Sequence, residues 1–407
     1  MQLPSRRFFA LSLSLGAVLV GSACGGGGGG DTPTPPPVGR AKWTVLVFLN
    51  AASDLFPFST LNVNQMEQVA NNPQVRFVVQ WKLAQDLYPT SLFNGTRRYL
   101  VKPDSTGQIN SQLLEDMGTG VDMGRAQTLK EFIDWGKQAY PADRYVVVVW
   151  NHGNGWRRSS SGAPTRGVSY DNQTGNAIQT WQLKQALEGH KHDILAYDAS
   201  LMQMIEVAYE SKDNADFIAG SEESPPGEGY PYQRVFAPFR DNPDATTRQL
   251  SKGFVDGMLN EPNYVDRKIT QSVVESSKLP AVATAYRNFA QALIANRAAL
   301  GTAVPQARAA AQSYSPTPNR IYRDMIDFSL ELEARTDIAS VRTASAAARQ
   351  AVAAALVWEG HNINSGKSRG LSIDVSDATS FASGSADYAR MTWNADSSWG
   401  SWLAVSP

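Results

Sequence analysis

The chain has 407 residues, which is enough for one large or two medium domains. Lys and Arg number 37 and Asp and Glu number 38, so bulk charge gives no support to nucleic-acid binding. The 42% content of hydrophobic residues is typical of a globular protein with a sizeable core. The four histidines and the single cysteine do not have the spacing of a metal site, so we expect neither a metal nor a cofactor.

Residues 1–24 have the features of an export signal that ends at a lipidation site. Arg6 and Arg7 precede an apolar run, Phe8–Val20, which is too short to be a confident membrane span. Small residues, Gly21–Ala23, stand directly before Cys24, the only cysteine. We therefore expect a signal peptide and a lipid anchor on Cys24; the alternative is a chance cysteine beside an ordinary cleavage site.

Residues 25–41 are predicted to form a linker. Gly25–Gly30 favours flexible coil, and the prolines of Asp31–Pro37 favour extended polyproline II. This composition suits a tether between a membrane anchor and a folded domain. Because glycine rather than aspartate follows Cys24, analogy with other lipoproteins favours the outer membrane of a bacterial cell envelope.

From residue 42 the pattern changes to alternating strands and helices. Apolar runs without strict polar alternation indicate strands that are covered on both faces. They lie at Trp43–Asn50, Arg76–Trp81, Tyr145–Asn151, His192–Tyr197 and Asp216–Gly220. Helical segments are expected between them, near Ser59–Asn71, Arg125–Ala139, Thr180–Glu188 and Met202–Lys212. This order predicts an α/β fold with a mostly parallel sheet and helices on both faces.

After about Pro238 the chain becomes alanine-rich. Helices are expected at Thr246–Leu259, Ala281–Leu300, Ile321–Glu333 and Val341–Trp358, with a further strand at Leu371–Val375. We assign residues 42–240 to a core domain and residues 241–407 to a helix-rich part that completes the fold. The pattern alone does not decide between a second domain and an extension of the same sheet.

Polar groups follow three of the predicted strands. Asn151-His152-Gly153 ends one strand, Asp198-Ala199-Ser200 ends the next, and the acid-containing segment Ser221–Tyr232 follows the third. Functional groups of open α/β sheets gather at the carboxyl ends of strands. A histidine, a hydroxyl and several acids are therefore expected to lie together.

Four spaced segments resemble the clostripain family of cysteine peptidases. They are Arg144–Gly153, Gly167–Asp171, Tyr197–Tyr209 and Ser221–Tyr232, and the resemblance extends over roughly residues 42–375. It implies the caspase-like fold that this family shares with legumains and gingipains, a three-layer sandwich, here with a helical C-terminal extension.

The resemblance implies that His152 and Ser200 occupy the two catalytic positions of the family. The family pairs a histidine with a cysteine, and here Ser200 stands at the cysteine, while Cys24 is the only thiol in the chain. A thiol titrates near about pH 8.5, whereas a hydroxyl needs a well-placed base, which serine enzymes orient with a third group. We find no clear third group in Asn151–Trp156.

Ser200 also has a reading that involves no chemistry. Ser200-Leu201-Met202-Gln203 fits a capping box, in which the serine caps a helix and the glutamine binds back to the cap. The hydroxyl would then be bound to backbone amides. The alternative is a residual nucleophile.

The resemblance further implies that Asp198 and Glu228 bind a basic side chain of a peptide. Family members that prefer a basic residue line this pocket with acids, and a carboxylate forms charge-assisted contacts with Arg or Lys. The alternative is that Asp198 only fixes the backbone and Glu228 is a solvated loop acid. Calcium dependence occurs in the family, but Asp171–Thr174 is only a partial match to a calcium loop. Arg157, Arg158 and Arg166 offer basic positions for the loop cleavage known in some members, but without a competent nucleophile we expect an uncut surface loop.

Three hypotheses follow. The leading one is a lipoprotein with a clostripain-like domain that is inactive or strongly impaired as a peptidase and binds peptides containing Arg or Lys. The second is a working serine hydrolase that uses Ser200 and His152. The third is a structural or interaction role.

Overall fold

The computed structural model describes residues 39–157, 167–314 and 321–407. Cys24, the expected signal peptide and most of the expected linker lie outside the described residues. Pro37–Pro407 forms one compact unit. Within the described ranges, no helix is both long and apolar enough to cross a bilayer.

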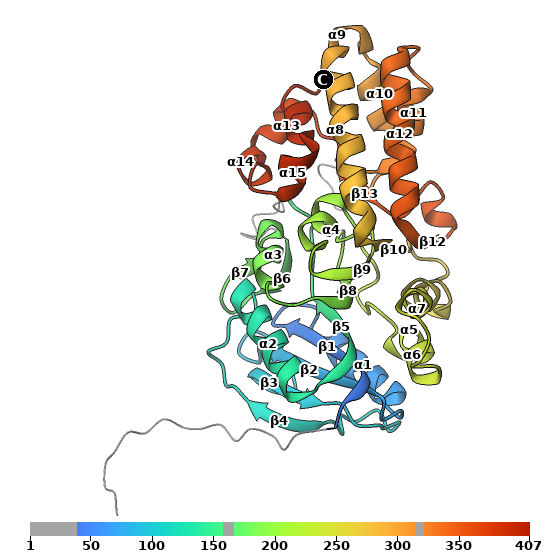
Figure 1. The fold of residues 1–407 in the computed structure, drawn as a ribbon. Coiled ribbons are helices and arrows are strands. Elements are labelled where there is room, and N and C mark those ends of the chain that lie inside the picture. Colours follow the sequence, from blue (N-terminus) through green and yellow to red (C-terminus); the bar gives the residue numbers. More distant parts are fainter. Residues whose placement is uncertain (1–38, 158–166, 315–320) are drawn as a thin grey trace, which may run out of the picture. The chain divides into compact units, whose positions relative to one another are not determined.

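The core of the fold is a nine-stranded sheet (Figure 1). Its five central strands are parallel to one another, as predicted, and an antiparallel pair of strands completes each edge. From one edge to the other the order is β12 (Leu356–His361), β10 (Thr270–Glu275), β9 (Ala215–Gly220), β8 (His192–Asp198), β5 (Ala142–Trp150), β1 (Ala41–Ala51), β2 (Val75–Leu83), β3 (Gly95–Leu100) and β4 (Gln112–Asp116).

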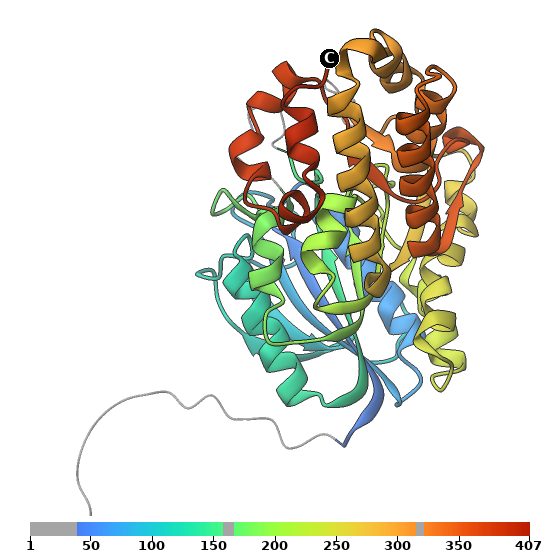
Figure 2. The ribbon, with the colours of Figure 1, turned by 45° about the horizontal axis from the view of Figure 1, so that its top comes forward.

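Helices cover both faces of the sheet, which explains the unbroken apolar runs. In β5, Val147 and Val149 belong to one apolar cluster, while Val146 and Val148 belong to the other. The first face packs against α2 (Ala126–Ala139), α3 (Leu183–Ala186), α4 (Ile205–Ser211), α8 (Leu279–Ala295) and α12 (Ala339–Ala355). The second face packs against α1 (Phe56–Val69), α5 (Tyr232–Val235), α6 (Ala237–Asp241) and α7 (Thr247–Leu259). Figure 2 shows the sheet between these two helical layers.

The C-terminal part extends the same sheet, because β10 and β12 are two of its nine strands. The expected helix Val341–Trp358 was wrong at its end: α12 stops at Ala355 and β12 begins at Leu356. Pairing with β10 overrides the helical pattern there. The expected strand at Leu371–Val375 is present as β13 (Ser372–Asp374), but it pairs with β11 (Tyr322–Asp324) outside the large sheet.

The remaining elements are short or peripheral. A hairpin of β6 (Val168–Asp171) and β7 (Asn176–Ile178) lies beside the loop after β5, since Gly153 and Val168 form a bridge. The other helices are α9 (Arg297–Leu300), α10 (Ala303–Ala310), α11 (Met325–Glu333), α13 (Ala378–Ala382), α14 (Ser385–Tyr388), α15 (Thr392–Ser397) and α16 (Trp399–Leu403). In Figure 1, α8, α10, α11 and α12 gather at one end of the fold.

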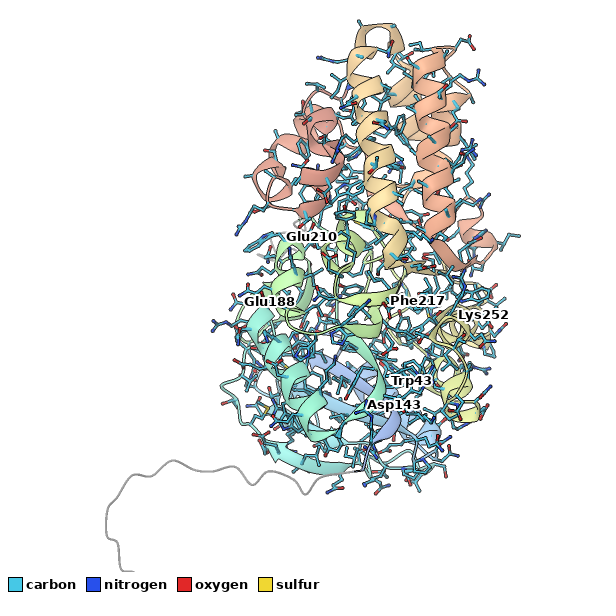
Figure 3. All side chains as sticks on the ribbon, viewed as in Figure 1. Trp43, Asp143, Glu188, Glu210, Phe217 and Lys252 are labelled. Carbon is cyan, nitrogen blue, oxygen red and sulfur yellow. The ribbon has the colours of Figure 1, made fainter. Side chains whose placement is uncertain are left out.

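Packed side chains cover the amino-terminal end of the central sheet at β1. Trp43 near the start of β1 donates its indole N–H to the Pro243 carbonyl at 3.0 Å and packs edge-on against Phe239. Figure 3 shows Trp43 close to Asp143 at this end of the sheet. The opposite, carboxyl ends of the strands are the ones that carry the polar loops.

Candidate functional site

A pocket of about 230 Å³ opens at the carboxyl ends of β5 and β8. It brings together three of the four residues that the sequence singled out in the folded domain, namely His152, Asp198 and Ser200. Its other lining residues are Leu55, Trp150, Asn151, Ala199, Pro225, Pro226, Gly227 and Gly229. Glu228 is half-buried between two lining glycines and is not itself part of the lining.

Close backbone approach fixes the position of Ser200 relative to His152. A Cβ atom on Gly153 would lie 2.5 Å from the carbonyl oxygen of Ser200. Only glycine fits there, so the loop that carries the imidazole lies directly against the loop that carries the hydroxyl. Among the described residues, neither the N–H of Gly153 nor that of Ser200 donates a hydrogen bond.

The capping box predicted at Ser200 does not form. Helix α4 begins at Ile205 with Met204 as its N-cap, and Leu201 has a left-handed φ of 62°. Gln203 points elsewhere: its Nε2 donates to Ser272 Oγ at 2.9 Å. Pairing of the loop with the β9 end, through Gln203 N–H to Ser221 O, overrides the local capping signal. Ser200 Oγ therefore caps no helix, and within the described part of the chain it has no hydrogen-bond partner.

Asp54 supplies a third group beside His152 that the sequence reasoning missed. His152 Nε2 lies 2.6 Å from Asp54 Oδ1, and this hydrogen bond lowers the pKa of Asp54. The other side of the imidazole meets Tyr170 edge-on, with ring centroids 6.2 Å apart. Asp54 follows the carboxyl end of β1. It therefore obeys the same rule as His152 and Ser200, that functional groups gather at the carboxyl ends of strands.

The turn that holds Asp54 is anchored to the histidine loop. Ser53 Oγ accepts hydrogen bonds from the N–H of Leu55 at 3.3 Å and from Asn151 Nδ2 at 3.4 Å. Asn151 Nδ2 also donates to Tyr170 O at 3.1 Å. These contacts hold the carboxylate and the aromatic ring at fixed places around His152.

Asp198 lies at the end of β8 and is only 4% exposed. Its Oδ1 accepts the N–H of Tyr230, and its Oδ2 accepts the hydroxyl of Tyr232, each at 3.0 Å. Burial raises the pKa of Asp198 to about 7, and the two hydrogen bonds oppose that shift. Gly229 packs against this carboxylate, since a Cβ there would lie 2.6 Å from Oδ1. Asp198 thus fixes the loop backbone and also lines the pocket.

Glu222, the first acid after β9, belongs to the scaffold. Its Oε2 accepts the N–H of Gly370 at 2.9 Å, and its carboxyl group interacts electrostatically with that of Asp324. Burial raises the pKa of Glu222, and it raises that of Asp324 to about 7. At neutral pH such a buried pair shares a proton rather than carrying two charges.

Two other residues from the sequence reasoning have buried structural partners. Asp171 Oδ2 lies 2.7 Å from Lys82 Nζ. The ammonium group of Lys82 thus occupies the position beside Asp171 that a calcium ion would need. Arg157 is 8% exposed and its Nε lies 2.7 Å from Asp374 Oδ2, so its side chain is not available to a protease. Arg158 and Arg166 lie outside the described residues. In the ranges that the structure describes, no three His, Cys, Asp or Glu residues form a group able to hold a metal ion.

Comparisons with known structures support the fold. An inactive zymogen of a C11 protease from Parabacteroides distasonis is similar in structure, with a TM-score of 0.69 and 20% sequence identity over 88% of this chain and 99% of that one. A secreted C11 cysteine protease from Bacteroides thetaiotaomicron, in complex with an irreversible peptide inhibitor, gives a TM-score of 0.66 at 19% identity, over 88% and 100% of the two chains. At these identities the likeness establishes the fold.

Sequence relationships give the family. Clostripain of Hathewaya histolytica is 30% identical over 161 residues, which are 35% of this chain and 31% of that protein, so the match spans about a third of the length of each. The sequence profile of the clostripain family matches residues 48–401. Because that match covers most of its length, the chain belongs to the clostripain family of peptidases.

Proposed function

We propose that this protein binds peptides through an Arg or Lys side chain, and that its peptidase activity is lost or strongly reduced. The observation that carries the proposal is that His152, Ser200 and Asp198 line the same pocket. The similar protease from B. thetaiotaomicron was solved with a peptide inhibitor, which supports a peptide as the ligand class here.

Loss of activity follows from the chemistry of the nucleophile position. We infer from the matching motif that Ser200 stands where the family has its catalytic cysteine. A hydroxyl must give its proton to a base as it attacks, whereas a thiol is already partly ionised at neutral pH. Ser200 Oγ makes no hydrogen bond to His152, whose Nε2 is bound to Asp54.

Recognition of a basic side chain follows from the acids of the pocket. Asp198 lines it, and a bound cation stabilises the ionised form of this carboxyl group. Glu228 stands between Gly227 and Gly229, which line the same pocket, and is our candidate for the second acid. Together they favour a cationic ligand over a neutral one.

A binding experiment tests this proposal. Fluorescent peptides with one central Arg, Lys, citrulline or norleucine are titrated with protein lacking residues 1–24. We expect Arg and Lys peptides to bind at least about tenfold more tightly than their neutral counterparts, and Asp198→Asn and Glu228→Ala to remove that difference. If all four peptides bind alike, or none binds, the proposal is wrong and a purely structural role gains support.

A serine hydrolase is the second candidate, and the contact between Asp54 and His152 favours it. Serine enzymes orient their base with a carboxylate, and Asp54 is placed to do this. The N–H groups of Gly153 and Ser200, which donate to no other group in the described ranges, are of the kind that stabilises an oxyanion. Hydrolysis of Arg amides or esters by the unaltered protein, lost in both Ser200→Ala and Asp54→Asn, would establish this candidate.

We also propose that the protein is exported and anchored by a lipid on Cys24. The support is the sequence before Cys24 and the glycine- and proline-rich stretch after it. Metabolic labelling with a clickable fatty acid should mark the protein, and Cys24→Ala should remove the label and release the protein from membranes. Label that persists in Cys24→Ala would contradict the anchor.

A further inference from the structure

One loop beside the pocket exposes large apolar side chains. It follows β2 and spans residues 84–94, where Leu87 is 47% and Leu92 is 59% exposed. Between them, Tyr88 stacks on Phe56 at the start of α1, with ring centroids 5.1 Å apart. Exposed apolar side chains that cluster in this way mark binding surfaces more often than leucines scattered singly.

Hydrogen bonds hold this loop in one conformation. Gln85 donates its N–H to Asn94 Oδ1 at 3.0 Å and its side-chain amide to Ser91 O at 3.0 Å. The turn between β6 and β7 also binds this loop, since Asn172 Nδ2 donates to Tyr88 Oη at 2.8 Å. A surface fixed in this way loses little conformational entropy when a ligand binds.

The loop is continuous with the histidine side of the pocket. Leu55 lines the pocket, and it stands between Asp54, which binds His152, and Phe56, which stacks on Tyr88. We give the name apolar shelf to five apolar residues of this loop and of the adjoining start of α1, namely Leu55, Phe56, Leu87, Tyr88 and Leu92. Pro225, Pro226, Gly227 and Gly229 also line the pocket, and Gly229 packs against Asp198 while Gly227 packs against Phe58 of α1.

We propose that the apolar shelf binds a large apolar side chain of the peptide on the C-terminal side of the basic residue. This inference rests on the proposed function, because Asp198 has to hold the basic side chain. It also rests on the general geometry of acyl transfer, in which the histidine protonates the leaving amine. The chain beyond that amine therefore runs past His152, toward Asp54 and the shelf.

The length of an extended peptide limits which residue reaches the shelf. Each residue adds about 3.3 Å, and alternate side chains point to the same side. The shelf begins at Leu55 in the pocket wall and continues over Phe56 to Tyr88 and Leu87. The apolar side chain thus belongs within the first few positions after the basic residue.

Peptide binding by the protein lacking residues 1–24 tests this inference. The probes are labelled decapeptides with a single Arg and otherwise small polar residues. A Leu or Phe is placed at one of the first four positions after the Arg, or at one of the four positions before it. We expect a Leu or Phe after the Arg to tighten binding about tenfold at one or two of these positions. The same residue before the Arg should have little effect.

Matched variants locate the effect on the protein. The double variant Leu87→Ser/Leu92→Ser removes the two exposed leucines of the shelf. Leu113→Ser/Leu330→Ser is the control, because these leucines are 48% and 43% exposed on β4 and α11. The shelf variant should lose the tenfold gain and keep its affinity for the all-polar Arg peptide, whereas the control variant should keep both.

The outcomes separate this inference from the proposed function. If Arg peptides bind but an apolar residue after the Arg gives no gain, the shelf proposal is overturned and the proposed function stands. A gain that survives in Leu87→Ser/Leu92→Ser, or that appears only for residues before the Arg, also overturns the shelf. If no Arg peptide binds in any form, both proposals fail. The comparison among peptides uses the unaltered protein, so it holds even if a variant folds poorly.

Discussion

Two neighbouring regions at the carboxyl ends of β5 and β8 differ in how their polar groups are used. In the pocket, His152 and Ser200 are half-exposed, and Ser200 Oγ has no hydrogen-bond partner among the described residues. Five residues after His152, Arg157 is buried and bonded through Nε to Asp374, through Nη1 to Ser380 O and through Nη2 to Ser376 Oγ.

The fixed region extends into a buried network. Trp156 Nε1 donates to Asp374 Oδ2 at 3.0 Å, and Glu206 Oε1 accepts both the N–H of Asp374 and the hydroxyl of Tyr388 at 3.0 Å. Burial raises the pKa of Glu206 to about 8. Hydrogen bonds thus fix the polar groups behind the pocket, while His152 and Ser200 are partly exposed where a ligand can reach them.

The largest effect is expected where the fixed region is broken. Arg157→Ala leaves the carboxylate of Asp374 buried without its guanidinium partner, which typically costs about 3–5 kcal/mol. Urea denaturation followed by tryptophan fluorescence measures this loss. A midpoint unchanged from that of the unaltered protein would show that the network does not carry the stability.

Gly153→Ala acts on the junction between the two regions. The new Cβ would lie 2.5 Å from Ser200 O, so the histidine and serine loops must move apart. We expect a loss of about 1–3 kcal/mol in unfolding free energy and weaker binding of Arg peptides. Gly120→Ala is the matched control, because Gly120, like Gly153, lacks a left-handed φ, and a Cβ there meets nothing within 4 Å. If both variants behave alike, the close approach to Ser200 is not responsible for the loss.

Asp198 makes ligand binding depend on pH. Its pKa is raised to about 7, so the carboxylate that attracts a cation forms as pH rises through that value. Affinity for an Arg peptide should increase by up to about tenfold between pH 6 and pH 8, and Asp198→Asn should abolish this dependence. Fluorescence anisotropy at a series of pH values measures it. Affinity that falls over this range would contradict the role of Asp198.

The same raised pKa has the opposite consequence for stability. The folded protein holds the proton of Asp198 up to about pH 7, whereas the unfolded chain loses it near the ordinary value of 3.8. The contribution to stability is therefore full below about pH 4 and is lost as pH rises through about 7. Asp198→Asn should flatten the decline in the urea midpoint across this window, and an unchanged decline would show that other acids dominate it.

The smallest effect on stability is expected at His152 itself. Its contact with Asp54 is exposed, with 72% of the Asp54 side chain open to solvent, so His152→Ala should change the unfolding free energy by less than about 1 kcal/mol. A loss as large as that of Arg157→Ala would place His152 in the scaffold rather than in an available site.

The alternation of strands and helices predicted the central sheet well. The run Val146–Val149 indicated a strand covered on both faces, and its side chains divide between the two apolar clusters. The antiparallel strands β3, β4, β10 and β12 were not found, because these short strands on the two flanks of the sheet lack such runs and are defined by pairing with other strands. Leu356–Trp358 shows this directly: it continues a helical pattern but pairs with β10.

The site was predictable where its residues end strands. His152, Asp198 and Ser200 end or follow β5 and β8 and line one pocket. Asp54 also follows a strand, β1, but no motif in its own segment marks the contact with His152, which is 98 positions away. The cap at Ser200 failed for a similar reason, since Gln203 is fixed by Ser272 and the β9 end rather than by its neighbours in sequence. Local patterns carry no information on such contacts.

Restoring a thiol tests the central claim most directly. Ser200→Cys and the unaltered protein, both without residues 1–24, are compared on fluorogenic Arg- and Lys-amide substrates. We predict cleavage after Arg or Lys in Ser200→Cys at a rate at least about 100-fold above that of the unaltered protein, and loss of this activity when His152→Ala is added. Equal rates for the two proteins, or no cleavage by folded Ser200→Cys, would contradict the claim that a changed nucleophile limits an otherwise intact pocket.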